Sequence, residues 1–142
     1  MGDGDDSAAA AVSATARLAG ATVLVVEDEA IVAVELELTL AEFGCAVLGP
    51  AVSVADALAL LDAGGGPPDA ALLDVGLRGE RSTAVAETLA RAGVPFAVVT
   101  GYGDGFLDSP ALAEAPRLAK PYDAAQVRDM LLALLGRGRA GG

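Results

Sequence analysis

Short apolar runs alternate along the chain with longer stretches in which apolar residues recur every three or four positions. The runs at residues 22–26 and 70–73 contain only apolar residues and one threonine, which is typical of strands buried on both faces of a parallel sheet. The longer stretches have the spacing of helices with one apolar face. We therefore expect strands at residues 22–26, 45–48, 69–74, 95–100 and 116–119, and helices at residues 29–43, 54–63, 82–91 and 124–135.

This alternation predicts an α/β fold with a doubly wound, five-stranded parallel sheet. Residues 101–114 contain three glycines and Pro110, so the fourth helix region should be short or irregular. Apolar residues at helical spacing give the first helix an expected core face of Val32, Leu36, Leu40 and Phe43.

One domain with two tails is the organisation that the sequence predicts. Residues 1–20 are acidic and Ala-rich, and we interpret them as a flexible tail. The domain should span residues 21–136. Gly136 is expected to end the last helix, which leaves residues 137–142 as a flexible C-terminal tail.

Composition narrows the classes of function. The net charge is −11 and the nine basic residues are scattered, so no basic stripe for nucleic acid is present. Histidine is absent, which excludes histidine acid/base chemistry and histidine metal ligands within the chain. The start of the chain is neither a convincing secretory signal nor a membrane span. With Cys45 as the one cysteine, we expect a cytoplasmic protein that binds no membrane.

Polar residues stand at the ends of four expected strands. In a parallel sheet these carboxyl ends lie on one edge, where open α/β sheets bind ligands. Taken singly, each has an ordinary explanation: helix-starting acids, a turn aspartate, a strand-forming threonine and a solvated lysine. In chain order the residues are Glu27, Asp28, Asp74, Thr100 and Lys120.

Their joint chemistry points to phosphoryl transfer. Three crowded carboxylates repel one another unless a cation lies among them, and oxygen ligands without histidine or cysteine suit Mg²⁺. The hydroxyl of Thr100 and the ammonium of Lys120 would orient a tetrahedral anion opposite the acids. Asp74, at the centre, is then the carboxylate that accepts the phosphoryl group.

Four segments also make the chain similar to a known family. Together they resemble a bacterial response-regulator receiver domain over residues 21–136. PFAVVTGYG, preceded by GERSTAVAETLARAGVPF, more narrowly resembles the FAT GUY subgroup of single-domain receivers. The four segments are VLVVEDE, LLDVGL, VVTGYGDG and AKPY.

The resemblance implies a fold like that of flavodoxin and a role for each site residue. Asp74 would be phosphorylated from a sensor histidine kinase or a histidine phosphotransferase. Thr100 and Lys120 would contact the phosphoryl oxygens, and the Lys120–Pro121 peptide bond would be cis. The Mg²⁺ ligands would be Glu27, Asp28, Asp74 and the backbone carbonyl of Gly76.

Several positions depart from the wider receiver pattern. Arg78 stands where a proline usually follows the phosphorylated strand. Arg117 replaces the usual switch aromatic, for which Tyr102 is the candidate substitute, and a Gly-rich segment replaces the fourth helix region. These departures bear on the switch and the output face rather than on phosphorylation.

Ile31, Val34 and Leu38 form a second apolar stripe on the first helix. We expect it to dock the phosphotransfer helices of a kinase, and the alternative is a wide core contact.

Because only residues 137–142 follow the domain, we expect a stand-alone receiver that signals to an unknown downstream protein or drains phosphoryl groups from a kinase. Two other classes of protein are alternatives to a receiver. A phosphohydrolase would place a second aspartate where Gly76 stands, as a general acid. A phosphorylation-independent binding module on the same fold would not need the full set of site residues.

Overall fold

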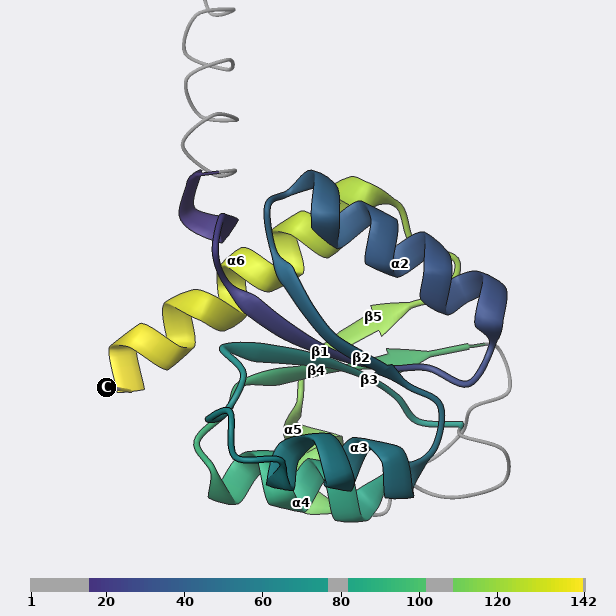
Figure 1. Cartoon of the computed structure of the whole chain (residues 1–142), viewed down its shortest axis with the longest axis vertical. Helices are drawn as coiled ribbons and strands as arrows, with labels where there is room; N and C mark the ends of the chain where they lie inside the picture. The colour runs from purple at the N-terminus through teal and green to yellow at the C-terminus, as the bar shows by residue number, and fades with distance from the viewer. Residues whose placement is uncertain (1–15, 77–81, 102–108, 142) are drawn as a thin grey trace, which may run out of the picture.

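The computed structural model describes residues 16–76, 82–101 and 109–141 of the chain (Figure 1). Within them, strands and helices alternate as the sequence predicts. The strands are β1 (Thr22–Val26), β2 (Ala46–Ala51), β3 (Ala70–Asp74), β4 (Phe96–Thr100) and β5 (Arg117–Ala119). The helices are α2 (Ala30–Glu42), α3 (Val54–Asp62), α4 (Thr83–Arg91), α5 (Pro110–Glu114) and α6 (Ala124–Gly141).

The sheet is parallel throughout, in the order β2-β1-β3-β4-β5. This confirms the predicted five-stranded, doubly wound α/β fold. β3 lies at the centre, and all five of its residues are buried. Its last residue, Asp74, is in register with Val99 of β4. The carboxyl end of the most protected strand therefore lies at the middle of one sheet edge.

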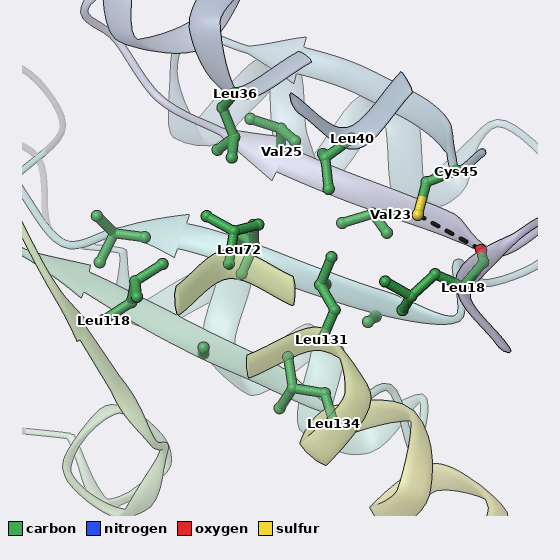
Figure 2. Packing of buried hydrophobic residues seen from close by; sticks show 14 residues of the cluster. Leu18, Val23, Val25, Leu36, Leu40, Cys45, Leu72, Leu118, Leu131 and Leu134 are labelled. Atoms are coloured by element: carbon green, nitrogen blue, oxygen red, sulfur yellow. Dashed lines mark hydrogen bonds between the residues drawn. The ribbon is translucent and has the colours of Figure 1, made fainter. Parts of the chain in front are cut away.

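The helices form two layers, one on each face of the sheet. Figure 1 shows α2 and α6 on one face, and α3, α4 and α5 on the other. The first face carries a core cluster in which Leu72 and Val25 of the sheet meet Leu36, Leu131 and Leu134 of the helices (Figure 2). A second cluster joins alternate residues of the same strands to α3, α4 and α5. Successive strand residues thus serve opposite layers, as strand geometry requires.

The folded core reaches further toward the N-terminus than the expected boundary at residue 21. Residues 16–18 form a helical turn, and the side chain of Leu18 is fully buried in the first cluster (Figure 2). Its carbonyl accepts a hydrogen bond from Sγ of the buried Cys45 at 3.5 Å. Among the residues that the structure describes, packing against the core therefore begins at Leu18.

β2 is longer than the sequence predicts, because Gly49-Pro50 continues the strand instead of ending it. β2 is an edge strand, where a proline removes no ladder hydrogen bond that a neighbour needs. The register with β1 shifts between Leu24 and Val26, and Gly49 has a φ of 100°. The Gly49–Pro50 peptide bond is cis.

Two other helix predictions are settled by the structure. α5 has only five residues, which confirms the short helix expected between the last two strands. α6 runs past Gly136 to Gly141, so the expectation that Gly136 ends it is wrong. A helical glycine costs only about 1 kcal/mol relative to alanine, and residues 137–141 contain no proline that would stop the helix.

Candidate functional site

The polar residues at the strand ends lie on one edge of the sheet, as the sequence predicts. Asp74 and Thr100 are the last residues of β3 and β4, while Glu27 and Lys120 directly follow β1 and β5. Backbone hydrogen bonds fix the two that lie beyond their strands. The Glu27 N–H donates to the Ala51 carbonyl at 2.9 Å, and the Lys120 N–H donates to the Thr100 carbonyl at 2.7 Å.

Lys120 joins three carboxylates. Its Nζ lies 3.0 Å from Oε1 of Glu27 and 3.1 Å from Oδ2 of Asp74. A third carboxylate oxygen, Oε1 of Glu29, lies 3.6 Å away. The side chains of Glu27 and Asp74 are only 3% and 6% exposed, against 65% for Glu29. The ion pairs of Lys120 with Glu27 and Asp74 are therefore shielded from solvent, whereas solvent screens the ion pair with Glu29.

Asp74 is held at both its side chain and its backbone. Oδ1 accepts a hydrogen bond from the Gly76 N–H at 2.9 Å, and Oδ2 accepts one from Lys120. The backbone carbonyl accepts a hydrogen bond from Oγ of the fully buried Ser82 at 2.5 Å. The carboxylate is thus fixed in one orientation at the sheet edge.

The acids fit a hard divalent cation. One carboxylate oxygen from each of Glu27, Asp28 and Asp74 can be chosen so that all three lie within 4.8 Å of one another. Mg²⁺ binds oxygen ligands at about 2.0–2.1 Å, so its opposite ligands lie roughly 4 Å apart. Small side-chain movements would bring the three oxygens into this range, and all three donors are of the kind that Mg²⁺ prefers.

Electrostatics separate the two buried acids. Burial raises the pKa of Glu27 to about 7, and its hydrogen bond with Asp74 acts in the same direction. Burial alone would also raise the pKa of Asp74, but hydrogen bonds with Glu27, Gly76 and Lys120 outweigh it and keep that pKa below its ordinary value. Asp74 is therefore a carboxylate at neutral pH, and Glu27 is the first of the two acids to take up a proton as the pH falls.

Lys120 stays protonated for a related reason. Burial favours a lower pKa for its ammonium, but the hydrogen bonds to Glu27 and Asp74 outweigh burial and raise the pKa above its ordinary value. The site thus contains a permanent positive charge beside an ionised carboxylate. This arrangement can attract a phosphoryl group and balance its charge.

Sequence reasoning missed two residues of this site. Glu29 starts the first expected helix, and its position beside Lys120 follows only from where α2 begins. Ser82 was considered only as a helix start, whereas its hydroxyl bonds to the carbonyl of Asp74.

Two of the expectations concern residues outside the described ranges. Tyr102 and Arg78 both lie there, so the switch role of Tyr102 stays a prediction. The N–H of Gly76 donates a hydrogen bond to Asp74. That the carbonyl of Gly76 binds a metal ion stays a prediction. Arg117, in place of the usual aromatic, is exposed at the start of β5, and the Lys120–Pro121 peptide bond is cis.

The second apolar stripe on α2 is open to solvent. Ile31, Val34 and Leu38 are 76%, 52% and 61% exposed, so the alternative of a wide core contact is wrong. The buried residues of α2 are Ala33, Leu36 and Leu40. This core face differs from the predicted one, because Val32 and Phe43 are only half-buried.

A groove of about 440 Å³ runs between α2 and the start of α6 and reaches Lys120. Its apolar lining includes Val32, Leu36 and Val127, and Tyr122 lies beside them.

None of the helices in the ranges that the structure describes is long and apolar enough to cross a membrane.

Comparison with solved structures finds relatives over most of the chain. SdrG from Sphingomonas melonis Fr1 is 40% identical, with a TM-score of 0.70, and the match covers 83% of this chain and 98% of that one. The BeF₃-activated conformation of SdrG from Pseudomonas melonis Fr1 is 42% identical, with a TM-score of 0.68 and coverage of 82% of this chain and 98% of that one. A response regulator receiver protein from Sinorhizobium medicae WSM419 is 25% identical, with a TM-score of 0.68 and coverage of 84% and 97%. No protein-family model and no curated protein matches the chain.

Proposed function

The chain belongs to the response-regulator receiver domains, and on this premise we propose that it accepts a phosphoryl group on Asp74 from a phosphohistidine of a partner protein. The observation that carries this proposal is the setting of Asp74. Its carboxylate is buried and ionised, and it lies beside both Lys120 and the acid cluster. A purely structural aspartate at a strand end would not need this combination.

The proposed reaction transfers one phosphoryl group. An oxygen of the Asp74 carboxylate forms a bond to phosphorus while the P–N bond of the donor phosphohistidine breaks. The electron pair of that bond stays on the imidazole nitrogen, and the imidazole leaves neutral because its other ring nitrogen carries a proton. Since the low pKa of Asp74 keeps its carboxylate ionised, the acceptor needs no general base.

Lys120 and Thr100 would contact the transferred group. The ammonium of Lys120 already lies 3.1 Å from Oδ2 of Asp74, so it is close enough to balance charge on the new phosphoryl oxygens. Thr100 ends the neighbouring strand β4, one residue after Val99, which pairs with Asp74. Its hydroxyl would supply the second contact.

Glu27, Asp28, Asp74 and the carbonyl of Gly76 would hold Mg²⁺. When bound, this ion would neutralise charge on the phosphoryl oxygens. The support from the chain itself is the set of three carboxylate oxygens within 4.8 Å of one another.

The partner that we propose is a sensor histidine kinase or a histidine phosphotransferase. Its phosphotransfer helices would dock on the exposed stripe of Ile31, Val34 and Leu38, because an apolar helix face in solvent is suited to helical packing. α2 begins only two residues after Asp28, so a partner on this helix would be near the site. The buried, unpaired Cys45 agrees with the reducing cytoplasm in which we place the reaction.

The output that we propose is protein binding to a downstream partner, or drainage of phosphoryl groups from a kinase. We assign the chain to the FAT GUY type of receiver on its PFAVVTGYG segment. In this assignment Tyr102 reports phosphorylation, because it lies two residues after Thr100 in the sequence and Arg117 leaves no aromatic at the usual position.

Labelling with a small phosphodonor tests the proposal. After incubation with acetyl phosphate and Mg²⁺, intact-mass analysis should show one added phosphoryl group, which Asp74→Asn and chelation of Mg²⁺ should each abolish. Asp69→Asn, which changes an exposed aspartate just before β3, is the matched control and should be labelled like the parent. Unlabelled parent protein would instead favour a phosphorylation-independent binding module.

A further inference from the structure

Ser82 makes an unusual hydrogen bond for its position. It stands at the N-cap of α4, its side chain is fully buried, and its Oγ donates to the backbone carbonyl of Asp74 at 2.5 Å. Both partners of this bond are shielded from water, since Asp74 is only 4% exposed. A buried hydrogen bond of this kind is costly to break, because the carbonyl would lose its partner without regaining water.

The hydroxyl of Ser82 does not cap its own helix. A serine at an N-cap normally accepts a hydrogen bond from a backbone N–H in the first turn, which is worth about 1 kcal/mol. Ser53 does this for α3, accepting from the Asp56 N–H at 3.1 Å. Ser82 forms no such bond in α4. Where a residue departs from its local role, the reason often lies at a functional site.

The bond from Ser82 completes the fixation of one peptide unit. The unit between Asp74 and Val75 contains the carbonyl of Asp74 and the N–H of Val75. The carbonyl accepts from Ser82, and the N–H donates to the Val99 carbonyl at 3.3 Å. Because a peptide unit is planar, holding both of its ends fixes its orientation.

That orientation determines how the chain returns to the acceptor carboxylate. The N–H of Gly76 reaches Oδ1 of Asp74 at 2.9 Å, and this contact depends on the direction in which the chain leaves the fixed unit. If the peptide between Asp74 and Val75 could rotate, Gly76 would move relative to the carboxylate. Both the hydrogen bond of Gly76 and the proposed metal ligand at its carbonyl would then lose their geometry.

We propose that Ser82 is a positioning residue for phosphoryl transfer. Its hydrogen bond to the carbonyl of Asp74, here called the clamp, keeps the Gly76 N–H within hydrogen-bond distance of the acceptor carboxylate. The inference rests on the proposed function for its effect on labelling. The dependence of the hydrogen bond between Gly76 and Asp74 on Ser82 does not rest on that function, because it concerns the unphosphorylated protein.

The test compares two serines at helix N-caps. Ser82→Ala removes the hydrogen bond to Asp74, whereas the control Ser53→Ala removes an ordinary cap from α3. The readouts are the amide proton resonance of Gly76 without added Mg²⁺, the Mg²⁺ dissociation constant from NMR titration, and the rate of labelling by acetyl phosphate.

For Ser82→Ala we expect the Gly76 amide proton to shift upfield as its hydrogen bond to Asp74 weakens. We also expect a loss on the order of tenfold in Mg²⁺ affinity and labelling rate, the size typical when a residue supporting a metal ligand is removed. Ser53→Ala should lower thermal stability but leave all three readouts at the parent's values. If Ser82→Ala does not fold, Ser82→Cys keeps a weak donor of similar size and should give changes of the same direction but smaller size.

An unshifted Gly76 resonance together with parental labelling in the Ser82 variant overturns the inference. Equal losses in Ser82→Ala and Ser53→Ala also overturn it, since they would reflect general destabilisation. The Gly76 resonance distinguishes failure of this inference from failure of the proposed function. If the parent protein is not labelled, the proposed function is wrong, but the Gly76 shift in Ser82→Ala still tests the role of Ser82.

Discussion

The ammonium of Lys120 lies 3.0 Å from Oε1 of Glu27, so the only lysine of the chain ties the end of the last strand to the end of the first. The same ammonium contacts the proposed acceptor, Asp74. Lys120 therefore balances acidic charge that a metal ion would also balance, and its removal should affect labelling and metal binding differently.

Replacing Lys120 with alanine should slow labelling but spare metal binding. Without the ammonium, the phosphoryl oxygens lose a charged donor, which typically costs on the order of a hundredfold in rate. Mg²⁺ affinity should stay the same or increase, because the carboxylates lose their internal cation. Arg117→Ala removes another positive charge, from the exposed start of β5, and should change neither quantity. Parental labelling in Lys120→Ala would remove Lys120 from the reaction.

Mg²⁺ affinity should fall as the pH is lowered through neutrality. Glu27 has a raised pKa of about 7 and must lose its proton to act as a metal ligand. Between pH 8 and pH 6 the dissociation constant should therefore rise about tenfold, with proton release on binding measurable by calorimetry in two buffers. Glu27→Gln should bind Mg²⁺ weakly, with little dependence on pH. A parent whose affinity is constant over this range would contradict the role of Glu27.

The pKa of Glu27 also predicts a change in stability with pH. Since its folded-state pKa lies above its ordinary value, Glu27 contributes stability at low pH that is lost as the pH rises through about 7. Without added metal, the parent should lose more thermal stability between pH 5 and pH 8 than Glu27→Gln does. Saturating Mg²⁺ should reduce this loss. Identical pH profiles for the two proteins would contradict the prediction.

Mg²⁺ should stabilise the fold through the acid cluster. A ligand at a hundred times its dissociation constant adds about 2.7 kcal/mol to the free energy of unfolding. The melting temperature of the parent should therefore rise with added Mg²⁺, and that of Asp28→Ala should rise much less, although its fold stays intact. Ca²⁺-free and Mg²⁺-free buffer gives the reference curve. A variant that gains as much stability as the parent would place the metal elsewhere.

The exposed stripe on α2 should govern labelling by a kinase only. Val34→Glu puts a charge on a half-exposed apolar position and should slow phosphoryl transfer from a phosphorylated kinase at least several-fold. Labelling by acetyl phosphate should be unchanged, because the site itself is intact. Ala59→Glu adds the same charge at an exposed position of α3, on the other face of the sheet, and should slow neither. Equal loss of both activities in Val34→Glu would indicate damage to the fold.

The sequence predicts the central strands well because their signals are local. β1 has the predicted bounds, and β3 differs from them by one residue, since both strands are short apolar runs between turn residues. The turn signal of Gly49-Pro50 predicts that β2 ends at residue 48, because this signal does not reveal that the strand lies at the edge of a sheet. The convergence of Glu27 and Lys120 was predictable, since parallel strands bring their carboxyl ends together.

Other properties of the site depend on the folded arrangement. The raised pKa of Glu27 requires burial and the neighbouring Asp74 from another strand. Neither can be predicted from residues 27–29 alone. Ser82 has the local sequence signal of a helix cap, and only the structure shows that its hydroxyl bonds to β3 instead. In both cases a contact between distant segments replaces the role that nearby residues predict.

The burial of Leu18 has a practical consequence for any shortened version of the protein. A version that starts at residue 21, where the strand pattern begins, would leave a space among Val23, Leu40 and Leu131, which share its cluster. Losing a buried leucine side chain commonly removes 2–5 kcal/mol of stability, out of roughly 5–15 kcal/mol for a whole domain. The smallest unit that folds by itself should therefore include the helical turn at residues 16–18.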